Sequence, residues 1–231
     1  GQLIYIEQIQ NLIKTMDENL LSFNDNYKNH YSKLKEDYEN EPVRQPYLAG
    51  RSYSSNRMDL LMFLDQMFKD TGVTSNENRC ALFLDDTKEI TGILAPHIDY
   101  QRGKDVYKET YRYLRHNKKN LLIIFGTSHK FTDKIWNISL KDFATPLEIL
   151  PVSKGLGELI RKNPVLNRYV EEWPHKTEHS IELQLPVIQF MLHNDFEILP
   201  VLTGHLDDYI KENKDISSEK EFEDIIDSFK K

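Results

Sequence analysis

The sequence is poor in cysteine, in long apolar runs and in positive charge, and each shortage argues against a class of protein. Its one cysteine, Cys80, excludes an intrachain disulfide and is consistent with a reducing compartment, so we expect a cytoplasmic protein. No apolar stretch approaches the roughly 20 residues that span a bilayer, which argues against a membrane protein. The formal net charge of -7 argues against nucleic acid as a partner, because phosphate backbones attract basic surfaces.

What the sequence does contain is typical of a folded α/β protein. Of its 231 residues 39% are hydrophobic, and they include eleven Phe, twelve Tyr and two Trp. Such rings bury enough apolar surface to offset the conformational entropy of the chain, so disorder is not expected. Segments with helical spacing of apolar residues alternate with short apolar runs. This order predicts an α/β fold with a mixed or mostly parallel central sheet flanked by helices.

The predicted elements begin with a polar helical arm. Apolar residues recur at near-helical spacing over residues 3 to about 38, and Pro42 and Pro46 then break any helix. We therefore expect an N-terminal helical arm or linker at residues 1–41 and an α/β domain at residues 42–231. Further helices are predicted at residues 58–68, 106–114, 156–160, 180–192 and 222–229. Strands are predicted at residues 90–94, 121–125, 135–140, 147–152 and 196–202. The apolar run at 121–125 is of the kind that is buried on both faces.

Two of the predicted strands lead into a histidine. The strand at 90–94 runs into His97, and the strand at 121–125 runs through Gly126 to His129. Ligands in open α/β sheets bind beyond the carboxyl ends of the strands, so both imidazoles would enter one crevice if the strands are neighbours. Imidazole is a common ligand of iron, copper and zinc, and this pair predicts a buried metal-type site. Position alone leaves open that His97 and His129 are unrelated loop histidines.

A third candidate lies around His179. If a helix begins here, Thr177 can cap it and Glu178 suits its positive end. His179 and Glu182 would then share one helical face, because they are three residues apart. This pattern is consistent with a capped helix that carries a surface pair. It is also consistent with His179 pointing into the crevice as a base, a hydrogen-bond donor or a partner of a metal ligand.

The remaining candidates are less specific. Asp99 and Tyr100 follow His97 closely, and either could orient an imidazole or meet a substrate. Asp99 could equally cap the next helix. We expect solvent exposure for the histidines that lie in polar contexts, namely His116, His175, His193 and His205.

Taken together, these stretches resemble the Memo family, also called AmmeMemoRadiSam system protein B. The matching pieces are Ala95-Pro96-His97 with Tyr100, Gly126-Thr127-Ser128-His129, Thr145-Pro146-Leu147, Glu178-His179-Ser180-Ile181-Glu182 with Leu185-Pro186, and Ile198-Leu199-Pro200-Val201-Leu202. Upstream, the segments similar to the family's motif at the start of the domain are Val43-Arg44-Gln45-Pro46 and Ala49-Gly50-Arg51-Ser52-Tyr53. Order and spacing agree from about residue 43 to residue 205.

The resemblance implies a fold similar to class III extradiol dioxygenases, which are non-haem iron enzymes. It implies that His97 and His129 are metal ligands, with iron as the cofactor and copper or zinc as alternatives. The function we expect is a metal-dependent oxidoreductase in which His179 and Tyr100 act on the substrate side. The alternative is a non-catalytic protein that binds a metal, a peptide or a small ligand in the same crevice, and a zinc hydrolase is a third reading. The family name points to a radical-SAM protein as a candidate pathway partner.

The sequence departs from the family pattern in two places. Asp99 stands where the family has glycine and Ile98 where it has a small residue, so the pocket entrance is expected to differ. The family's Ser-Asp-x-x-His stretch and its later third ligand, commonly a cysteine, have no counterpart here, and Cys80 lies on the wrong side of His97. We therefore expect a chain that lacks its C-terminal part. The other explanation is a divergent chain that takes a third ligand from elsewhere, such as His179.

Overall fold

The structure is a computed structural model in which the chain divides into two compact units, Gly1–Pro42 and Val43–Lys231. Each unit is described by itself below. The residues that the structure describes are 5–69, 91–116, 120–130, 132–192, 196–204 and 206–230. Cys80, which the sequence suggests as a small core residue, lies outside these ranges.

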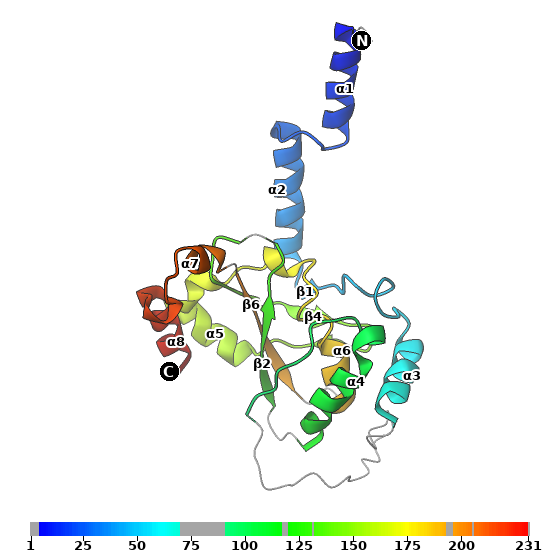
Figure 1. Ribbon diagram of the computed structural model, residues 1–231, viewed down its shortest axis with the longest axis vertical. Helices are drawn as coiled ribbons and strands as arrows, with labels where there is room; N and C mark the ends of the chain where they lie inside the picture. Colours follow the sequence, from blue (N-terminus) through cyan, green and yellow to red (C-terminus); the bar gives the residue numbers. More distant parts are fainter. Residues whose placement is uncertain are drawn as a thin grey trace. The chain divides into compact units, whose positions relative to one another are not determined.

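The first unit consists of two helices, α1 (Ile6–Glu18) and α2 (Asp25–Asn40), as the spacing of its apolar residues predicts (Figure 1). Leu20 follows the first helix with a φ of 59°, in the left-handed region. Asn24 starts the second helix, because its side chain accepts a hydrogen bond from the backbone N–H of Tyr27 at 3.0 Å. Among the described residues of both units, no helix is long and apolar enough to cross a membrane.

The described strands of the second unit form two small sheets, so the expectation of one central sheet is wrong. The first sheet has the order β1-β4-β5 and contains β1 (Val43–Arg44), β4 (Asp142–Ala144) and β5 (Ile149–Leu150). Its strands run in mixed directions, because β4 is parallel to β1 and antiparallel to β5. Pro146 and Pro151 follow β4 and β5 closely and limit these ladders, since proline has no N–H to donate.

The second sheet has the order β2-β6-β3 and positions the candidate site. β2 (Leu121–Thr127) and β6 (Glu197–Thr203) are parallel, whereas β3 (Trp136–Ile138) is antiparallel to β6. Thr127 at the end of β2 pairs with Thr203 at the end of β6. The carboxyl ends of both strands therefore meet at one edge, where the loop that carries His129 begins.

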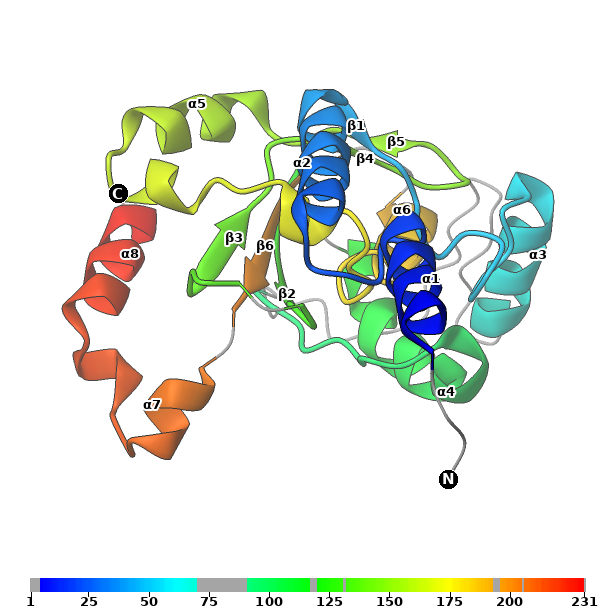
Figure 2. The ribbon, with the colours of Figure 1, turned by 90° about the horizontal axis from the view of Figure 1, so that it is seen from above.

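Helices lie on both sides of the β2-β6-β3 sheet (Figure 1, Figure 2). On one side are α3 (Arg57–Phe68), α4 (Tyr100–Tyr111) and α6 (Leu185–Leu192). On the other are α5 (Lys154–Lys162), α7 (Asp207–Lys211) and α8 (Lys220–Lys230). Short 3₁₀ helices occur at Arg112–His116, Leu166–Tyr169, Trp173–His175 and Ile216–Ser218. The prediction of a mixed α/β fold with flanking helices is confirmed.

β6 is the strand that separates the two hydrophobic cores. Ile198 and Leu202 belong to the core that contains α3, α4 and α6. Leu199 and Val201 belong to the core that contains α5 and α8. Because successive side chains of a strand point to opposite faces, this continuous apolar run is buried on both sides.

β2, for which burial on both faces was predicted, is covered on one face only. Leu122 and Ile124 pack against the first core. Ile123 and Phe125, which alternate with them, are 45% and 55% exposed. The difference is that Leu199 and Val201 of β6 pack into the second core, with residues of α5 and α8, whereas Ile123 and Phe125 lie outside that core.

The two segments that lead to the candidate histidines also differ from prediction. Residues 91–94, expected to be the larger part of a strand, have no regular structure, and residue 90 lies outside the described ranges. The helix predicted from Ser180 begins at Leu185, after a run of turns. Pro186 explains the later start, since proline is tolerated in the first turn of a helix but removes a hydrogen bond from its interior.

Candidate metal centre

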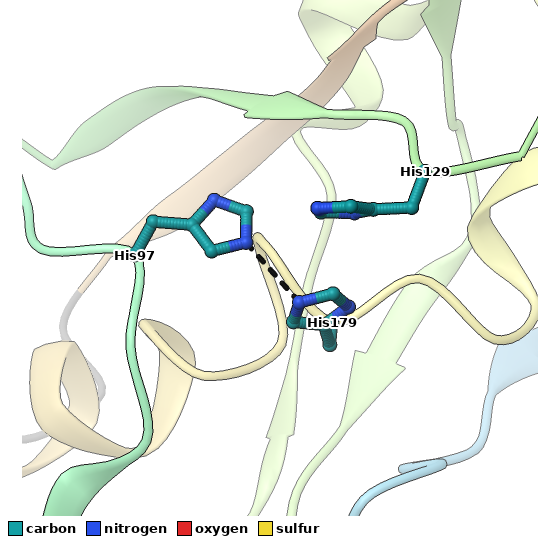
Figure 3. A group of neighbouring side chains, drawn as sticks. All are labelled: His97, His129 and His179. Carbon is teal, nitrogen blue, oxygen red and sulfur yellow. Dashed lines mark hydrogen bonds between the residues drawn. The ribbon is translucent and has the colours of Figure 1, made fainter. Parts of the chain in front are cut away.

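Three histidines converge from three separate segments of the second unit (Figure 3). His97 precedes α4, His129 follows β2, and His179 lies in the turn before α6. One ligand atom from each ring lies within 4.8 Å of the others. Nε2 of His97 is 3.1 Å from Nε2 of His179, and the rings of His129 and His179 stack with their centroids 4.4 Å apart. The structure thus brings His97 and His129, the two predicted ligands, together with His179.

The end of β2 holds the loop of His129 against the turn that carries His179. The backbone N–H of Ser128 donates to the carbonyl of Thr203 at 2.9 Å, which continues the pairing with β6. The hydroxyl of Ser180 donates to the carbonyl of Thr127 at 2.9 Å. Gly126 allows this close approach, because a Cβ there would lie 2.6 Å from the side chains of both Ile181 and Ser180.

Side-chain amides and hydroxyls hold the segment of His97. The amide nitrogen of Gln184 donates to the carbonyl of Pro96 at 3.1 Å and to the carbonyl of Ser180 at 3.2 Å. The hydroxyl of Tyr107 donates to the carbonyl of Ile98 at 3.0 Å. These hydrogen bonds hold the residues on either side of His97, which does not follow a strand as the sequence predicts. Asp99 caps α4 by accepting the N–H of Arg102 at 3.1 Å, which settles its two possible roles in favour of the cap.

Glu178 is the acceptor that the other two histidines share. Its Oε2 accepts the backbone N–H of His129 at 2.8 Å. Its Oε1 accepts the backbone N–H groups of His179 and Ser180 at 2.7 and 3.0 Å. The same Oε1 lies 3.0 Å from Nδ1 of His129 and 3.1 Å from Nδ1 of His179. Glu178 therefore binds the loops and the rings at once, whereas the sequence suggested only a favourable charge at a helix start.

The charges around the site favour an ionised carboxylate beside a neutral imidazole. Burial raises the pKa of Glu178, but the hydrogen bonds from His129, Ser180 and His179 outweigh it, so that the net pKa is lowered. Partial burial lowers the pKa of His97, the neighbouring His129 and His179 lower it further, and Glu178 opposes them. A neutral imidazole is the form that binds a metal ion.

The site is open to solvent, so the expectation of a buried site is wrong. The side chain of His129 is 47% exposed and that of His179 is 35% exposed, whereas Glu178 below them is 4% exposed. His97 is also exposed. The imidazoles of His129 and His179 thus rest on a buried carboxylate while remaining accessible to solvent.

A buried ion pair fixes the turn from its other side. Glu182, predicted to share a helical face with His179, is fully buried and lies 2.5 Å from Nη1 of Arg44. Arg44 also donates to the carbonyls of His175 and Glu178 at 3.0 and 2.8 Å. The other donors to the Glu182 carboxylate are the backbone N–H groups of Tyr47 and Leu48 and the hydroxyl of Tyr53. The segment around Arg44 thus holds the turn that bears His179.

Three further predicted residues have structural positions. Tyr100 lies in the core, 1% exposed, and its hydroxyl donates to the carbonyl of Leu183 rather than facing the histidines. The hydroxyl oxygen of Thr177 is buried without a hydrogen-bond partner among the described residues, so Thr177 does not cap a helix. His175, expected to be solvated, is 1% exposed, and its Nε2 lies 2.9 Å from the carbonyl of Asn137. The side chains of His116, His193 and His205 lie outside the described residues.

Fold and site together define a mixed α/β protein with a three-histidine cluster at the edge of a sheet. A family model described as Memo-like protein matches residues 44–220, and these residues include all three histidines. The chain belongs to the Memo family, and the resemblance seen in its motifs is confirmed.

Individual relatives agree with this assignment. The chain is 27% identical over 207 residues to a MEMO1 family protein of Aquifex aeolicus, which covers 90% of this chain and 52% of that protein. It is 31% identical over 166 residues to a MEMO1 family protein of Methanosarcina barkeri, and the match covers 72% of this chain and 56% of that protein. It is 28% identical to a MEMO1 family protein of Pyrococcus abyssi, and this match covers 74% of this chain and 56% of that protein. The chain spans about half the length of these curated relatives.

Proposed function

We propose that this chain binds a transition-metal ion through Nε2 of His97, His129 and His179 and belongs to a metal-dependent oxidoreductase. The observation that supports the proposal is the convergence of three imidazoles from three segments onto one point. Iron is the ion we favour, with copper and zinc as alternatives, because imidazole suits all three. A fold related to class III extradiol dioxygenases forms part of the same proposal and rests on the family resemblance.

The donor set fits such an ion. Two nitrogens that share an ion at about 2.1 Å lie roughly 3.0–3.4 Å apart, and the separation between His97 and His179 is 3.1 Å. The ligand atom of His129 lies within 4.8 Å of those of His97 and His179 and completes the set. Three protein ligands leave coordination positions open for a substrate. His179 is thus proposed as a ligand, and its alternative role is that of a base beside a two-histidine site.

In this proposal a bound iron or copper ion supplies redox chemistry and polarises substrate oxygen atoms. The chain itself supplies orientation and charge. Glu178 holds His129 and His179 from below, and Gln184 holds the segment of His97. Tyr100 supports the site through the carbonyl of Leu183.

The alternative function is metal or ligand binding without catalysis, and solvent exposure favours it. Enzymes that activate a substrate at a metal generally exclude water from the site. Here the side chains of His129 and His179 are 47% and 35% exposed, which suits the exchange of an ion with a partner. A radical-SAM protein is the candidate partner that the family suggests.

The metal site is tested by elemental analysis of the purified chain after reconstitution with iron, copper or zinc. We expect about one ion per chain in the wild type and its loss in His97→Ala, His129→Ala and His179→Ala. His30→Ala, in the first unit, is the matched control and should retain the ion. The proposal fails if the wild type retains none of the three metals or if the three variants bind as the wild type does.

Enzyme and binder are distinguished by turnover. Oxygen consumption is measured with the metal-loaded chain and catechol-like substrates under reducing conditions. Consumption that disappears in the His129→Ala variant supports the oxidoreductase. A fully loaded chain without turnover, which releases its ion readily to a chelator, supports the binding function.

A further inference from the structure

One carboxylate, that of Glu178, lies beside the Nδ1 atoms of two different candidate ligands. Its Oε1 is 3.0 Å from Nδ1 of His129 and 3.1 Å from Nδ1 of His179. Backbone N–H groups of His129, His179 and Ser180 donate to the same carboxylate, which anchors it to both loops. The two imidazoles therefore meet an acceptor whose position is fixed before any ligand arrives.

An acceptor at Nδ1 determines the tautomer of an imidazole. A neutral ring carries one N–H donor and one acceptor nitrogen, and the hydrogen bond at one nitrogen decides the state of the other. Nδ1 of His129 carries the proton, because it donates a hydrogen bond to the carboxylate. Nδ1 of His179 lies 3.1 Å from the same oxygen, and a negative oxygen at that distance favours a proton over a lone pair on this nitrogen as well. Nε2 of each ring then keeps its lone pair. For His179 that lone pair faces Nε2 of His97, 3.1 Å away.

We infer that Glu178 is a positioning residue that holds His129 and His179 in the Nδ1–H form and directs both Nε2 lone pairs towards the point they share with His97. The inference deepens the proposed metal binding and rests on it for its effect on affinity. Its tautomer part concerns the metal-free chain and stands independently. In the metal-free chain His97 holds its proton on Nε2, because this nitrogen donates to the Nε2 lone pair of His179.

His175 supplies an internal reference for this inference. It lies four residues before His179, and its Nε2 is 2.9 Å from the carbonyl oxygen of Asn137, which can only accept. His175 therefore holds its proton on Nε2, opposite to His129 and His179. A loss of structure would disturb all of these rings, whereas the loss of the Glu178 carboxylate should change only those it contacts.

The test is long-range ¹H–¹⁵N NMR of the histidine side chains in the full chain without metal, near neutral pH. We expect Nδ1–H signals for His129 and His179 and Nε2–H signals for His97 and His175. Glu178→Gln removes the negative charge and leaves one oxygen where the backbone N–H groups of His129, His179 and Ser180 had two. His129 and His179 should therefore shift towards Nε2–H while His175 stays unchanged. Glu178→Asp, which keeps a carboxylate, should retain more of the wild-type pattern.

Zn²⁺ affinity, measured by competition with a chromophoric chelator, supplies the second readout. We expect Glu178→Gln to bind Zn²⁺ roughly 10–100-fold more weakly than the wild type, as is usual when a carboxylate behind a ligating histidine is lost. The matched control is Glu158→Gln on the exposed surface of α5, which should bind as the wild type does.

The inference is overturned if His129 and His179 of the wild type hold their protons on Nε2, a result that does not depend on any variant folding. It is also overturned if Glu178→Gln changes neither tautomers nor affinity. If the tautomers follow the prediction but neither zinc, iron nor copper binds the wild type, the positioning role stands and the proposed metal function fails.

Discussion

Gln184 donates its side-chain amide to the carbonyl oxygen of Pro96 at 3.1 Å, and this contact joins the segment of His97 to the turn of His179. The two residues are 88 positions apart in the sequence. The same nitrogen donates to the carbonyl of Ser180 at 3.2 Å. One amide thus links the two segments that carry His97 and His179.

Gln184→Met should lower both stability and metal affinity. Methionine fills a similar volume but leaves the carbonyls of Pro96 and Ser180 without this donor, a loss of about 1–3 kcal/mol in the free energy of unfolding. Urea denaturation and Zn²⁺ competition measure the two effects. The control is Gln189→Met, another buried glutamine, which bonds Thr145 and Glu148. It should lose stability and keep its affinity, and equal affinity loss in both variants would contradict a specific role for Gln184.

Gly126→Ala should displace the turn that carries His179. The added Cβ would lie 2.6 Å from side-chain atoms of Ile181 and Ser180, which real contacts do not tolerate. Overpacking of this kind lowers the free energy of unfolding by about 1–3 kcal/mol. Gly155→Ala in α5 meets open space and should raise stability by about 0.4–1 kcal/mol. Thermal unfolding of both variants tests the pair, and a neutral Gly126→Ala would show that the turn moves freely.

Glu182→Gln should be one of the most destabilising single substitutions in the second unit. It leaves the guanidinium of Arg44 buried without its counter-charge, which costs about 3–5 kcal/mol. Replacing Arg44 by Met as well should recover part of that loss, because no uncompensated charge then remains. Glu18→Gln, in an ion pair whose two side chains are 73% and 62% exposed, should change stability by less than about 1 kcal/mol. Urea denaturation compares the variants, and a loss similar to that of Glu18→Gln would refute the role of the pair.

His175 should make the second unit less stable as the pH falls. Burial lowers its folded-state pKa from 6.5 to about 4, with a smaller contribution from the charge of Arg44. Between these two values the unfolded chain binds a proton that the folded chain does not, so stability is full above pH 6.5 and decreases towards pH 4. The full loss is about 3 kcal/mol at 1.36 kcal/mol per unit of pKa.

The measurement is the free energy of unfolding as a function of pH, for the wild type and for His175→Gln. The variant starts from a lower stability but should lack this component of the slope. Identical slopes over pH 6.5 to 4 would show that His175 does not carry the dependence.

Local patterns were enough to predict much of the secondary structure. The apolar spacing at residues 58–68 and 222–229 predicts α3 and α8, and the runs at 121–125 and 196–202 predict β2 and β6. These elements follow from side-chain periodicity, which neighbouring residues carry by themselves. The later start of α6 was missed because it depends on Pro186, which favours the first turn of a helix, and on the Gln184 side chain, which donates to the Ser180 carbonyl that a helix from Ser180 would use.

The candidate site, too, has features that the sequence predicts and features that only the tertiary structure decides. The sequence alone determined which imidazoles are available and that His97 and His129 follow apolar segments. Only the tertiary structure decided that His179 joins them, that Glu178 supports two of the rings, and that the site is open to solvent. The physical reason is that these properties depend on distances between segments far apart in the chain. Such distances are set by the pairing of β2 with β6 and by contacts such as that of Gln184 with Pro96, which no local periodicity encodes.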